Sequence, residues 1–160
     1  MNKTLYDEAV NIAETCDVSI PADAAVLYSI SYLPTTENRD RAFAYVQEHL
    51  GAFMIEDTAC GKKLVELGIG YREVGLTQQE VAQIWSIASR RFINGLKGNV
   101  TAFVEHADAR SVFRRVELPL LLANPAVMKI NQVDKSMAIS YGIPVLLFYS
   151  FVRLNQNQNY

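Results

Sequence analysis

Apolar residues keep to a helical spacing most clearly in the stretch that begins at Leu76. Thr77 is followed three positions later by Glu80, a capping-box pattern in which each side chain satisfies a free backbone N–H group. The apolar positions that come next fall on one face of a helix, namely Val81, Ile84, Trp85, Ala88, Phe92 and Leu96. The pattern predicts an amphipathic helix to about Lys97, with Gly98 as its left-handed C-terminal cap.

The first half of the chain is predicted to be mostly helical. Apolar residues at helical spacing indicate helices over 4–15 and 39–50, and a short helix near 64–67. Residues 24–30 form a compact apolar run between turn residues, and this length favours a buried strand over a helix. Residues 71–75 are expected to be a linker.

The second half mixes strands with short helices. Residues 100–104 are apolar and partly β-branched, which indicates a strand. We expect a turn or short helix over 120–123 and a strand over 126–133. The very apolar segment 143–154 favours strand over helix by a narrow margin, and the Asn/Gln-rich residues 155–160 are expected to fray.

These elements predict an α/β (α+β) fold. In it, a helical N-terminal half packs on a small, mostly parallel sheet in the C-terminal half. The chain has 160 residues, of which 50% are apolar, enough for one domain with a substantial core. No internal repeat or inter-domain linker divides the sequence, so residues 1–160 are expected to form a single domain.

Charge and hydropathy exclude several classes of partner. The net charge of −2 gives no indication of a nucleic-acid or anionic-membrane surface. The longest apolar run, 142–152, is shorter than the roughly 20 residues that a transmembrane helix needs. The polar, acidic N-terminus differs from a signal peptide. We therefore expect a soluble protein with no nucleic-acid and no membrane partner, and secretion within a larger precursor stays open.

Cysteine and histidine positions indicate neither a metal site nor a nucleophilic triad. Cys16 and Cys60 are too few for a disulfide framework or a metal cluster, and two buried thiols are favoured over one bridge. His49 and His106 have no Cys, Ser or second His at ligand or triad spacing. The sequence also has no glycine-rich phosphate loop and no nucleophile elbow. No metal and no separate cofactor are expected.

Trp85 and Ser89 lie four residues apart, so both side chains project from one face of the predicted helix. A flat aromatic ring beside a hydroxyl and the basic pair Arg90–Arg91 would suit a ligand that joins an aromatic ring to phosphates. The alternatives stay open: a single Trp at helical spacing is often a core residue, and paired arginines often form a solvated face.

Acidic residues interrupt or end apolar runs at two sites, Glu117 and the adjacent pair Glu56 and Asp57. On a strand, Glu117 would point away from Val116 and Leu118, either into solvent at a sheet edge or into an apolar cleft. In a cleft, its carboxylate could stabilise an oxocarbenium-like centre during cleavage of a glycosidic bond. Glu56 and Asp57 could favour a helix start through the helix dipole, or accept hydrogen bonds from an amide group of a ligand.

Taken together, these stretches resemble the ADP-ribosyl cyclase / NAD glycohydrolase family. Residues 25–29 (AVLYS) are similar to its apolar strand that ends in an aromatic residue and Ser, and residues 54–58 (MIEDT) to its Glu-Asp-Thr segment. Residues 85–92 (WSIASRRF) are similar to its Trp-x3-Ser-Arg-Arg-Phe helix, which a strand and a Ser-x-Phe-x3-Glu segment follow. The resemblance runs from about 24 to 127, and places the catalytic region at 24–134.

The resemblance implies roles for three residues in the reaction. Glu117 would be the catalytic glutamate, holding the ribose hydroxyls and stabilising the positive ribosyl centre as nicotinamide leaves. Trp85 would stack on the nicotinamide or the ribosyl intermediate. Tyr28 would form a second aromatic wall of the site.

It also implies which residues bind the rest of the substrate. Glu56, with Asp57 beside it, would receive the carboxamide of nicotinamide. The phosphates would contact one residue of the long helix and a loop after the following strand, namely Ser89, Ser111, Val112 and Phe113.

The chain departs from the family's pattern in four places. Tyr28 stands where the family has Trp, and Ile30 where an Arg is expected, which removes one phosphate contact. The chain has only two cysteines, whereas family members at the animal cell surface are rich in disulfides, and the span between Glu56 and Trp85 is short. A disulfide-poor version resembles the NAD-consuming toxin domains at the C-termini of bacterial contact-dependent inhibition and polymorphic-toxin effectors, which act in a reducing cytosol.

The resemblance thus implies an NAD⁺ glycohydrolase that gives nicotinamide and ADP-ribose. Such a toxin domain would act in the target-cell cytoplasm, and a cognate immunity protein would be its partner. Three alternatives remain: an ADP-ribosyl cyclase that makes cyclic ADP-ribose, a non-catalytic module that keeps the fold to bind a nucleotide or a protein, and a globular protein with no nucleotide site. The changes at Tyr28 and Ile30 favour the module, whereas the retained Trp85, Ser89 and Glu117 favour an enzyme.

Overall fold

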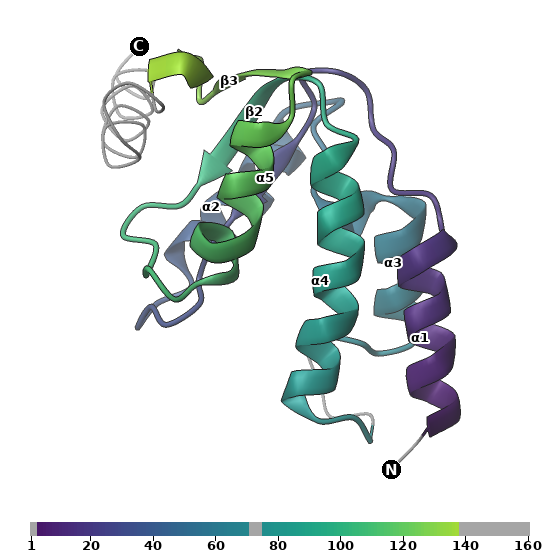
Figure 1. Cartoon of the computed structure of the whole chain (residues 1–160). Coiled ribbons are helices and arrows are strands. Elements are labelled where there is room, and N and C mark those ends of the chain that lie inside the picture. The colour runs from purple at the N-terminus through teal and green to yellow at the C-terminus, as the bar shows by residue number, and fades with distance from the viewer. Residues whose placement is uncertain (1–2, 71–74, 138–160) are drawn as a thin grey trace.

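The structure, a computed structural model, describes residues 3–70 and 75–137 (Figure 1). The predictions made for 71–74 and for 143–160 lie outside the described residues. In the described residues, helices and strands are mixed along the chain, and the strands form one small sheet. Among these residues no helix combines the length and the apolar character needed to cross a bilayer.

The sheet has four strands in the spatial order β1-β2-β3-β4. They are β1 (Val26–Tyr28), β2 (Gly98–Phe103), β3 (Val127–Ile130) and β4 (Val133–Asp134). β1 pairs with β2 and β2 with β3 in parallel, whereas β3 and β4 are antiparallel. The predicted mostly parallel α/β sheet is therefore confirmed, and β1 brings a segment of the N-terminal half into it.

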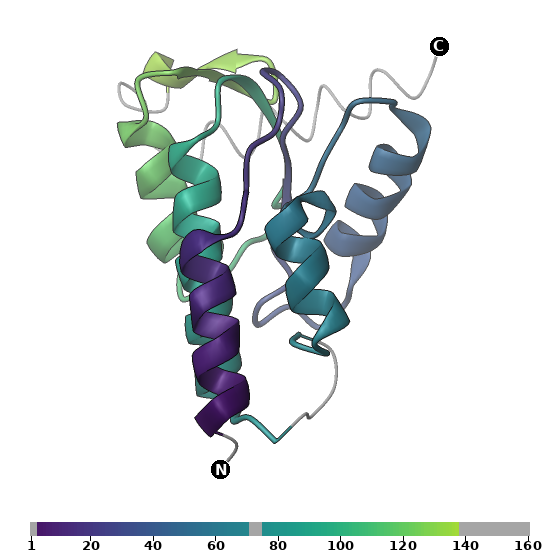
Figure 2. The same ribbon diagram turned by 90° about the vertical axis from the view of Figure 1, so that its right-hand side faces the viewer.

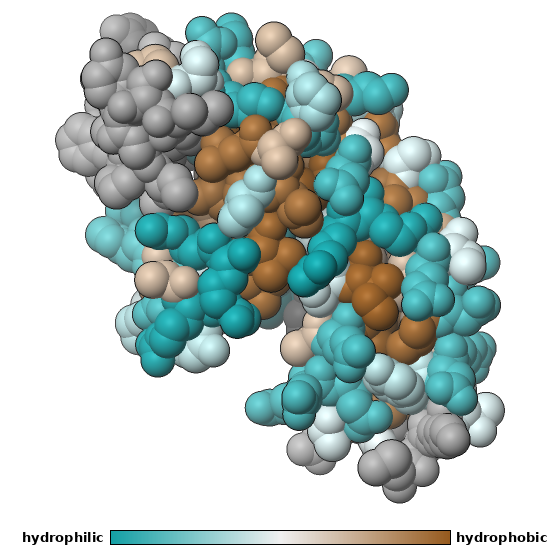
Figure 3. Space-filling model, in the orientation of Figure 1, coloured by the Kyte–Doolittle hydropathy of each residue, from teal (hydrophilic) through white to brown (hydrophobic). Residues whose placement is uncertain are grey.

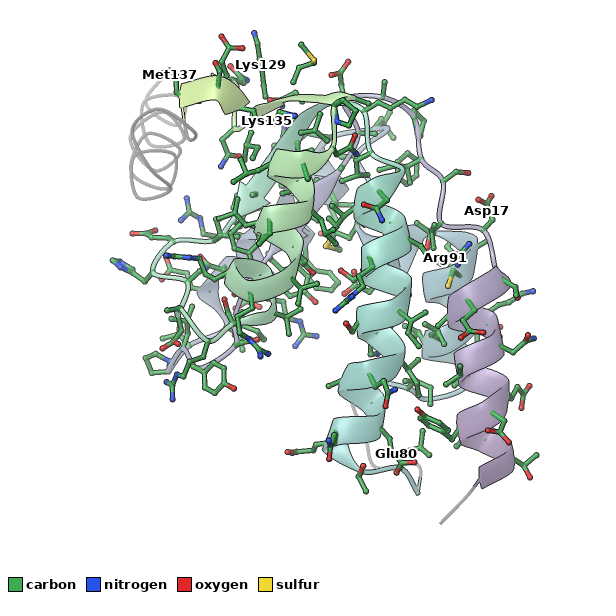
Figure 4. All side chains as sticks on the ribbon, viewed as in Figure 1. Asp17, Glu80, Arg91, Lys129, Lys135 and Met137 are labelled. Atoms are coloured by element: carbon green, nitrogen blue, oxygen red, sulfur yellow. The ribbon has the colours of Figure 1, made fainter. Side chains whose placement is uncertain are left out.

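Five α-helices have both ends within the described residues: α1 (Lys3–Thr15), α2 (Glu37–Glu48), α3 (Ala59–Glu66), α4 (Gln78–Asn94) and α5 (Leu118–Ala123). Residues 135–137 are also helical. α1, α3 and α4 lie side by side, and α5 packs against α4 (Figure 1). The Arg91 guanidinium in α4 donates to the carbonyls of Ala13 and Cys16 at the end of α1, at 2.7 and 2.9 Å. Figure 4 shows Arg91 pointing toward that end of α1, near Asp17.

Strand alternation divides the core between the two faces of the sheet. Leu27 in β1 and Val100 and Ala102 in β2 pack with residues of α4 and α5. Val26, which precedes Leu27, and Phe103, which follows Ala102, pack with α2 on the other side. Figure 2 shows α2 across the strands from α4 and α5. In Figure 3, apolar side chains reach the surface over α5 and in the seam between α1 and α4, with polar side chains around them.

Three local predictions need correction. The capping box of Thr77 and Glu80 is present, but α4 ends at Asn94 and its C-cap is Gly95. Gly98 is left-handed (φ 79°), yet it opens β2 and does not cap α4. The position requires glycine, because a side chain there would overlap the Asp23 carboxylate, which accepts a hydrogen bond from the Asn99 N–H. The predicted strand 126–133 is two strands, β3 and β4, joined by a turn.

The segment that carries Glu117 is helical. The side-chain direction expected for Glu117 on a strand is therefore wrong. Residues Phe113–Glu117 form a π-helical turn, η2, which continues directly into α5. The backbone N–H of Leu118 donates to the carbonyl of Phe113, five residues earlier, which is the π-helical pattern. Pro119 is the second residue of α5 and has no N–H to donate, so the helical hydrogen bonding is interrupted where η2 passes into α5.

Candidate active site

One pocket of about 280 Å³ collects side chains from β1, α4 and the two short helical turns η1 (Ile55–Asp57) and η2. It lies at the carboxyl end of β1, the edge of a parallel sheet where ligands commonly bind. Its wall includes six of the residues predicted from the sequence, Tyr28, Glu56, Trp85, Ser89, Val112 and Glu117. In Figure 3 the surface is hollowed between α4 and the loops that follow β1 and β2.

Glu117 is held in the pocket by a hydrogen bond from α4. Ser89 is 8% exposed, and its hydroxyl donates to Oε1 of Glu117 at 2.8 Å. Burial raises the pKa of Glu117 to about 7, the Ser89 donor lowers it, and the negative charge of Glu56 raises it. This carboxylate therefore changes its charge near neutral pH.

The π-helical turn determines which side chains accompany Glu117. Val112 and Glu117 are five residues apart, and both line the pocket. Phe113 points instead into the core, where it is 2% exposed. In a π-helix, residues five apart lie closer together around the axis than they do in an α-helix, where this spacing separates them widely.

Glu56 comes from η1 and meets β1. The Tyr28 hydroxyl donates to Oε1 of Glu56 at 2.8 Å, while Oε2 of Glu56 is buried and accepts no hydrogen bond from the described residues. Burial raises the pKa of Glu56 above its usual value, and the Tyr28 donor lowers it. A buried carboxylate oxygen without a donor is costly, so the site suits a ligand that donates to it.

Trp85 is partly buried on the pocket side of α4, where it also packs against the core formed by α1, α3 and α4. Gly70 lies against its indole, since a β-carbon on Gly70 would be 3.2 Å from Nε1 of Trp85. Trp85 thus packs against this core and also lines the pocket.

Three predicted site residues are not among the residues that line the pocket. A carboxylate oxygen of Asp57, Oδ2, accepts from the backbone N–H of Met54 at 2.8 Å and caps η1. Ser111 is fully buried, and its hydroxyl accepts from the N–H of Arg114. Phe113 belongs to the core, so within this loop only Val112 reaches the pocket.

The structure adds pocket residues that the sequence analysis missed. Ser31 follows β1, Gly70 follows α3, and Ser86 is next to Trp85 on α4. Ser86 could have been found from its spacing, because it lies three residues before Ser89 on the same predicted helix. Ser31 and Gly70 lie in irregular segments with no periodic pattern, and only the folded chain places them at the pocket.

Neither cysteine is among the residues that line the pocket. Cys16 and Cys60 are both free thiols. The sequence favours two buried thiols, but only Cys60 is buried and Cys16 is partly buried. Within residues 3–70 and 75–137, no group of three or more His, Cys, Asp or Glu side chains is arranged to hold a metal ion.

Comparison with solved structures identifies the fold. The chain is similar to porcine CD38 complexed with a covalent intermediate, ribo-F-ribose-5′-phosphate, with a TM-score of 0.52 and 19% identity over 80% of this chain and 68% of that one. Apo porcine CD38 gives a TM-score of 0.50 and 17% identity, covering 91% of this chain and 78% of that one. The fold is thus the ADP-ribosyl cyclase/CD38 fold that the sequence predicted.

A structure of Aplysia cyclase complexed with substrate NGD and product cGDPR gives a TM-score of 0.49 and 21% identity, over 69% of this chain. The present chain spans 48% of that protein's length, less than half of it. No protein-family model matches the sequence, and no curated protein matches it. What the comparisons establish for this chain is a shared fold of mixed α/β type.

Proposed function

We propose that this protein is an NAD⁺ glycohydrolase that cleaves the bond between nicotinamide and ribose. The observation that carries the proposal is the placement of Glu117: a carboxylate enclosed in a pocket, held by Ser89, with an indole and a second carboxylate on the same wall. A negative group in such a site can stabilise positive charge that develops on a sugar ring. The likeness of the fold to porcine CD38 complexed with a covalent intermediate, ribo-F-ribose-5′-phosphate, and the resemblance of the sequence motifs to NAD glycohydrolases support NAD⁺ as the substrate.

The pocket has the groups that nicotinamide requires. Trp85 offers an aromatic face to the pyridine ring, and Glu56 offers a buried carboxylate oxygen to the carboxamide N–H. Leu27 and Ile55 supply apolar walls. The nicotinamide end of NAD⁺ would therefore enter the pocket, and the ribose would lie next to Glu117.

The reaction needs only this chain, NAD⁺ and water. The bond between the ribose C1′ and the nicotinamide N1 breaks, and its electron pair neutralises the pyridinium nitrogen. Positive charge passes to the ribosyl ring, which the ionised Glu117 stabilises. Water then attacks C1′ and loses a proton, so that the products are nicotinamide, ADP-ribose and one proton.

Incubation of the purified protein with NAD⁺, with products separated by chromatography, tests this proposal. We expect wild type to release nicotinamide and ADP-ribose, and Glu117→Gln to lower kcat at least about 100-fold, because the charge is lost while the shape is kept. Glu105→Gln is the matched control, since Glu105 pairs with Arg41 and His106 outside the pocket lining. Full turnover by Glu117→Gln would refute the catalytic assignment.

The identity of the products decides between the related activities. Cyclic ADP-ribose in place of ADP-ribose would mean that the ribosyl intermediate is captured by the adenine base. If wild type at micromolar concentration binds NAD⁺ but releases no nicotinamide, the protein would be a non-catalytic binding module.

We further propose that this activity serves a bacterial toxin domain delivered to a target cell, as in contact-dependent inhibition. Depletion of NAD in the target-cell cytoplasm would be the toxic effect, and an immunity protein that closes the pocket would protect the producing cell. The proposal is supported by the resemblance of the chain to disulfide-poor toxin domains and by its free thiols. Expression of wild type inside bacteria should then lower cellular NAD, and expression of Glu117→Gln should not.

A further inference from the structure

Tyr28 has an unusual place for an aromatic wall residue, because its polar end is engaged with a second site residue. Its hydroxyl donates to Oε1 of Glu56 at 2.8 Å. The other oxygen of Glu56, Oε2, is buried and has no donor among the described residues. One oxygen of this carboxylate is thus occupied by the protein, and the other is left for a ligand.

The ring of Tyr28 is held where its hydroxyl can do this. Tyr28 is the last residue of β1 and pairs in register with Phe103 of β2. Its side chain lies on the face of the sheet that α2 covers, with its ring centroid 6.2 Å from that of Phe43. Backbone pairing and ring packing therefore restrict where the hydroxyl can point, and Glu56 is restrained through it.

We propose that Tyr28 is a positioning residue that holds Glu56 so that Oε2 receives an N–H donor of the ligand. The site thereby selects a neutral carboxamide over a carboxylate. This inference rests on the proposed function, because the carboxamide concerned is that of nicotinamide. This role requires Tyr at position 28, because the hydroxyl at the end of its ring is the hydrogen-bond donor to Glu56.

The charges around Glu56 agree with this selectivity. Burial raises the pKa of Glu56, and the negative charge of Asp57 raises it further. Three groups lower the pKa of Glu56: the hydrogen bond from Tyr28, the peptide N–H of Glu56 itself, and the positive charge of Arg39 on α2. Glu117 from η2 is the other carboxylate that interacts with Glu56. Once ionised, Glu56 accepts an N–H group and repels a carboxylate.

Tyr28→Phe tests the role of the hydroxyl, because it removes one oxygen and keeps the ring. We expect the Kd of nicotinamide, measured by calorimetry, to rise about tenfold, and nicotinic acid to bind neither protein measurably at pH 8. With NAD⁺ as substrate, KM should rise about tenfold and kcat should change less than about threefold. Tyr45→Phe is the matched control: Tyr45 packs in the same cluster, outside the pocket lining, and should leave both values unchanged.

A second readout does not depend on activity. With ¹³C-labelled glutamate, NMR can follow the titration of the Glu56 carboxyl group, assigned with Glu56→Gln. Loss of the Tyr28 donor should move this titration to higher pH, because the ionised form loses a hydrogen bond. An unchanged titration in Tyr28→Phe would refute the positioning role, whether or not the protein cleaves NAD⁺.

The ligand can also be varied against unmodified protein. N,N-diethylnicotinamide has no amide N–H, so it should bind at least about tenfold more weakly than nicotinamide. Equal binding of the two would overturn the role of Oε2, while NAD⁺ cleavage would leave the proposed function standing. If wild type neither cleaves NAD⁺ nor binds NAD⁺ or nicotinamide, the proposed function fails, and the titration of Glu56 still decides whether Tyr28 positions it.

Discussion

Glu117 owes its chemistry to its surroundings. A glutamate in water is ionised well below neutral pH, but burial in the pocket and the nearby charge of Glu56 raise the pKa of Glu117 to about 7, against the hydrogen bond from Ser89. The folded protein therefore holds this proton more tightly than the unfolded chain does. Ionisation of Glu117 then opposes folding.

The stability of the protein should consequently fall as pH rises from about 4.5 to about 7. In this window the folded state binds more protons at Glu117 than the unfolded state, so the free energy of unfolding decreases with pH. The full contribution of this group is on the order of 3 kcal/mol. Urea denaturation of wild type and Glu117→Gln at pH 5 and pH 8 measures it.

Because Gln carries no charge, Glu117→Gln should be the more stable protein at pH 8 and close to wild type at pH 5. Glu105→Gln, at a carboxylate outside the pocket lining, should show no such pH-dependent difference. If Glu117→Gln were less stable than wild type at pH 8, burial of this charge would not oppose folding.

At the scale of elements, the position of Glu56 depends on how closely η1 approaches α3. Thr58 joins the two: its hydroxyl donates to the carbonyl of Ile55 at 2.6 Å and accepts from the N–H of Gly61 at 3.0 Å. A β-carbon on Gly61 would overlap the carbonyl oxygen of Ile55 and lie 2.7 Å from the Cα of Glu56. Gly61 is therefore needed for close approach of two backbones.

Gly61→Ala should lower the free energy of unfolding by about 2–3 kcal/mol, because backbone atoms cannot move aside as a flexible side chain would. NAD⁺ cleavage should fall with it, since η1 carries Glu56. Thermal and urea unfolding measure the first effect, and product chromatography the second.

Gly95→Ala is the matched control for this substitution. Gly95 caps α4 in a right-handed conformation, and a β-carbon there would be 3.6 Å from its nearest neighbours, which is ordinary contact. It should change stability by less than about 1 kcal/mol. Equal effects of the two substitutions would mean that close packing at Gly61 does not hold η1 in place.

At the scale of the whole molecule, one buried amide joins the loop that follows β1 to the loop that follows β2. Nδ2 of Asn38 in α2 donates to the carbonyl of Ser29 after β1 and to the carbonyl of Glu105 after β2, each at 2.9 Å. Asn38 is 5% exposed, so both bonds are shielded from water. The carboxyl ends of the two parallel strands are thereby held together beside the pocket.

Asn38→Ala should lower the free energy of unfolding by about 2 kcal/mol, because it leaves two carbonyl groups without their donor. Urea denaturation measures the loss, and hydrogen exchange of the loops after β1 and β2 should quicken. Asn94→Ala, at an exposed position at the end of α4, should cost less than about 0.5 kcal/mol. A uniform loss of protection across the chain would argue against a local role for Asn38.

Most elements were predictable because their signals are local. The capping box of Thr77 and Glu80 begins α4 as expected, and the helices expected over 4–15 and 39–50 begin and end within two residues of α1 and α2. The turn that divides β3 from β4 was missed, since Asn131 and Gln132 take left-handed conformations that no strong turn motif announces.

The site was predictable only in part. Glu117, Trp85 and Ser89 could be grouped from their spacing and from a family resemblance, and the pocket does bring them together. The orientation of the segment 111–117 was not predictable, because a π-helical turn arises where η2 continues into α5 and packs on α4. That turn directs Phe113 to the core and Val112 to the pocket.

By itself, the sequence determined the α/β class, the main helices and strands, and the residue types available for chemistry, since periodicity and capping act over a few neighbouring positions. Only the tertiary structure decided which of these residues meet. The hydrogen bond from Tyr28 to Glu56 and that from Ser89 to Glu117 each span 28 residues of sequence. Contacts at such separation depend on how sheet and helices pack, and the same packing removes water from Glu117 and raises its pKa.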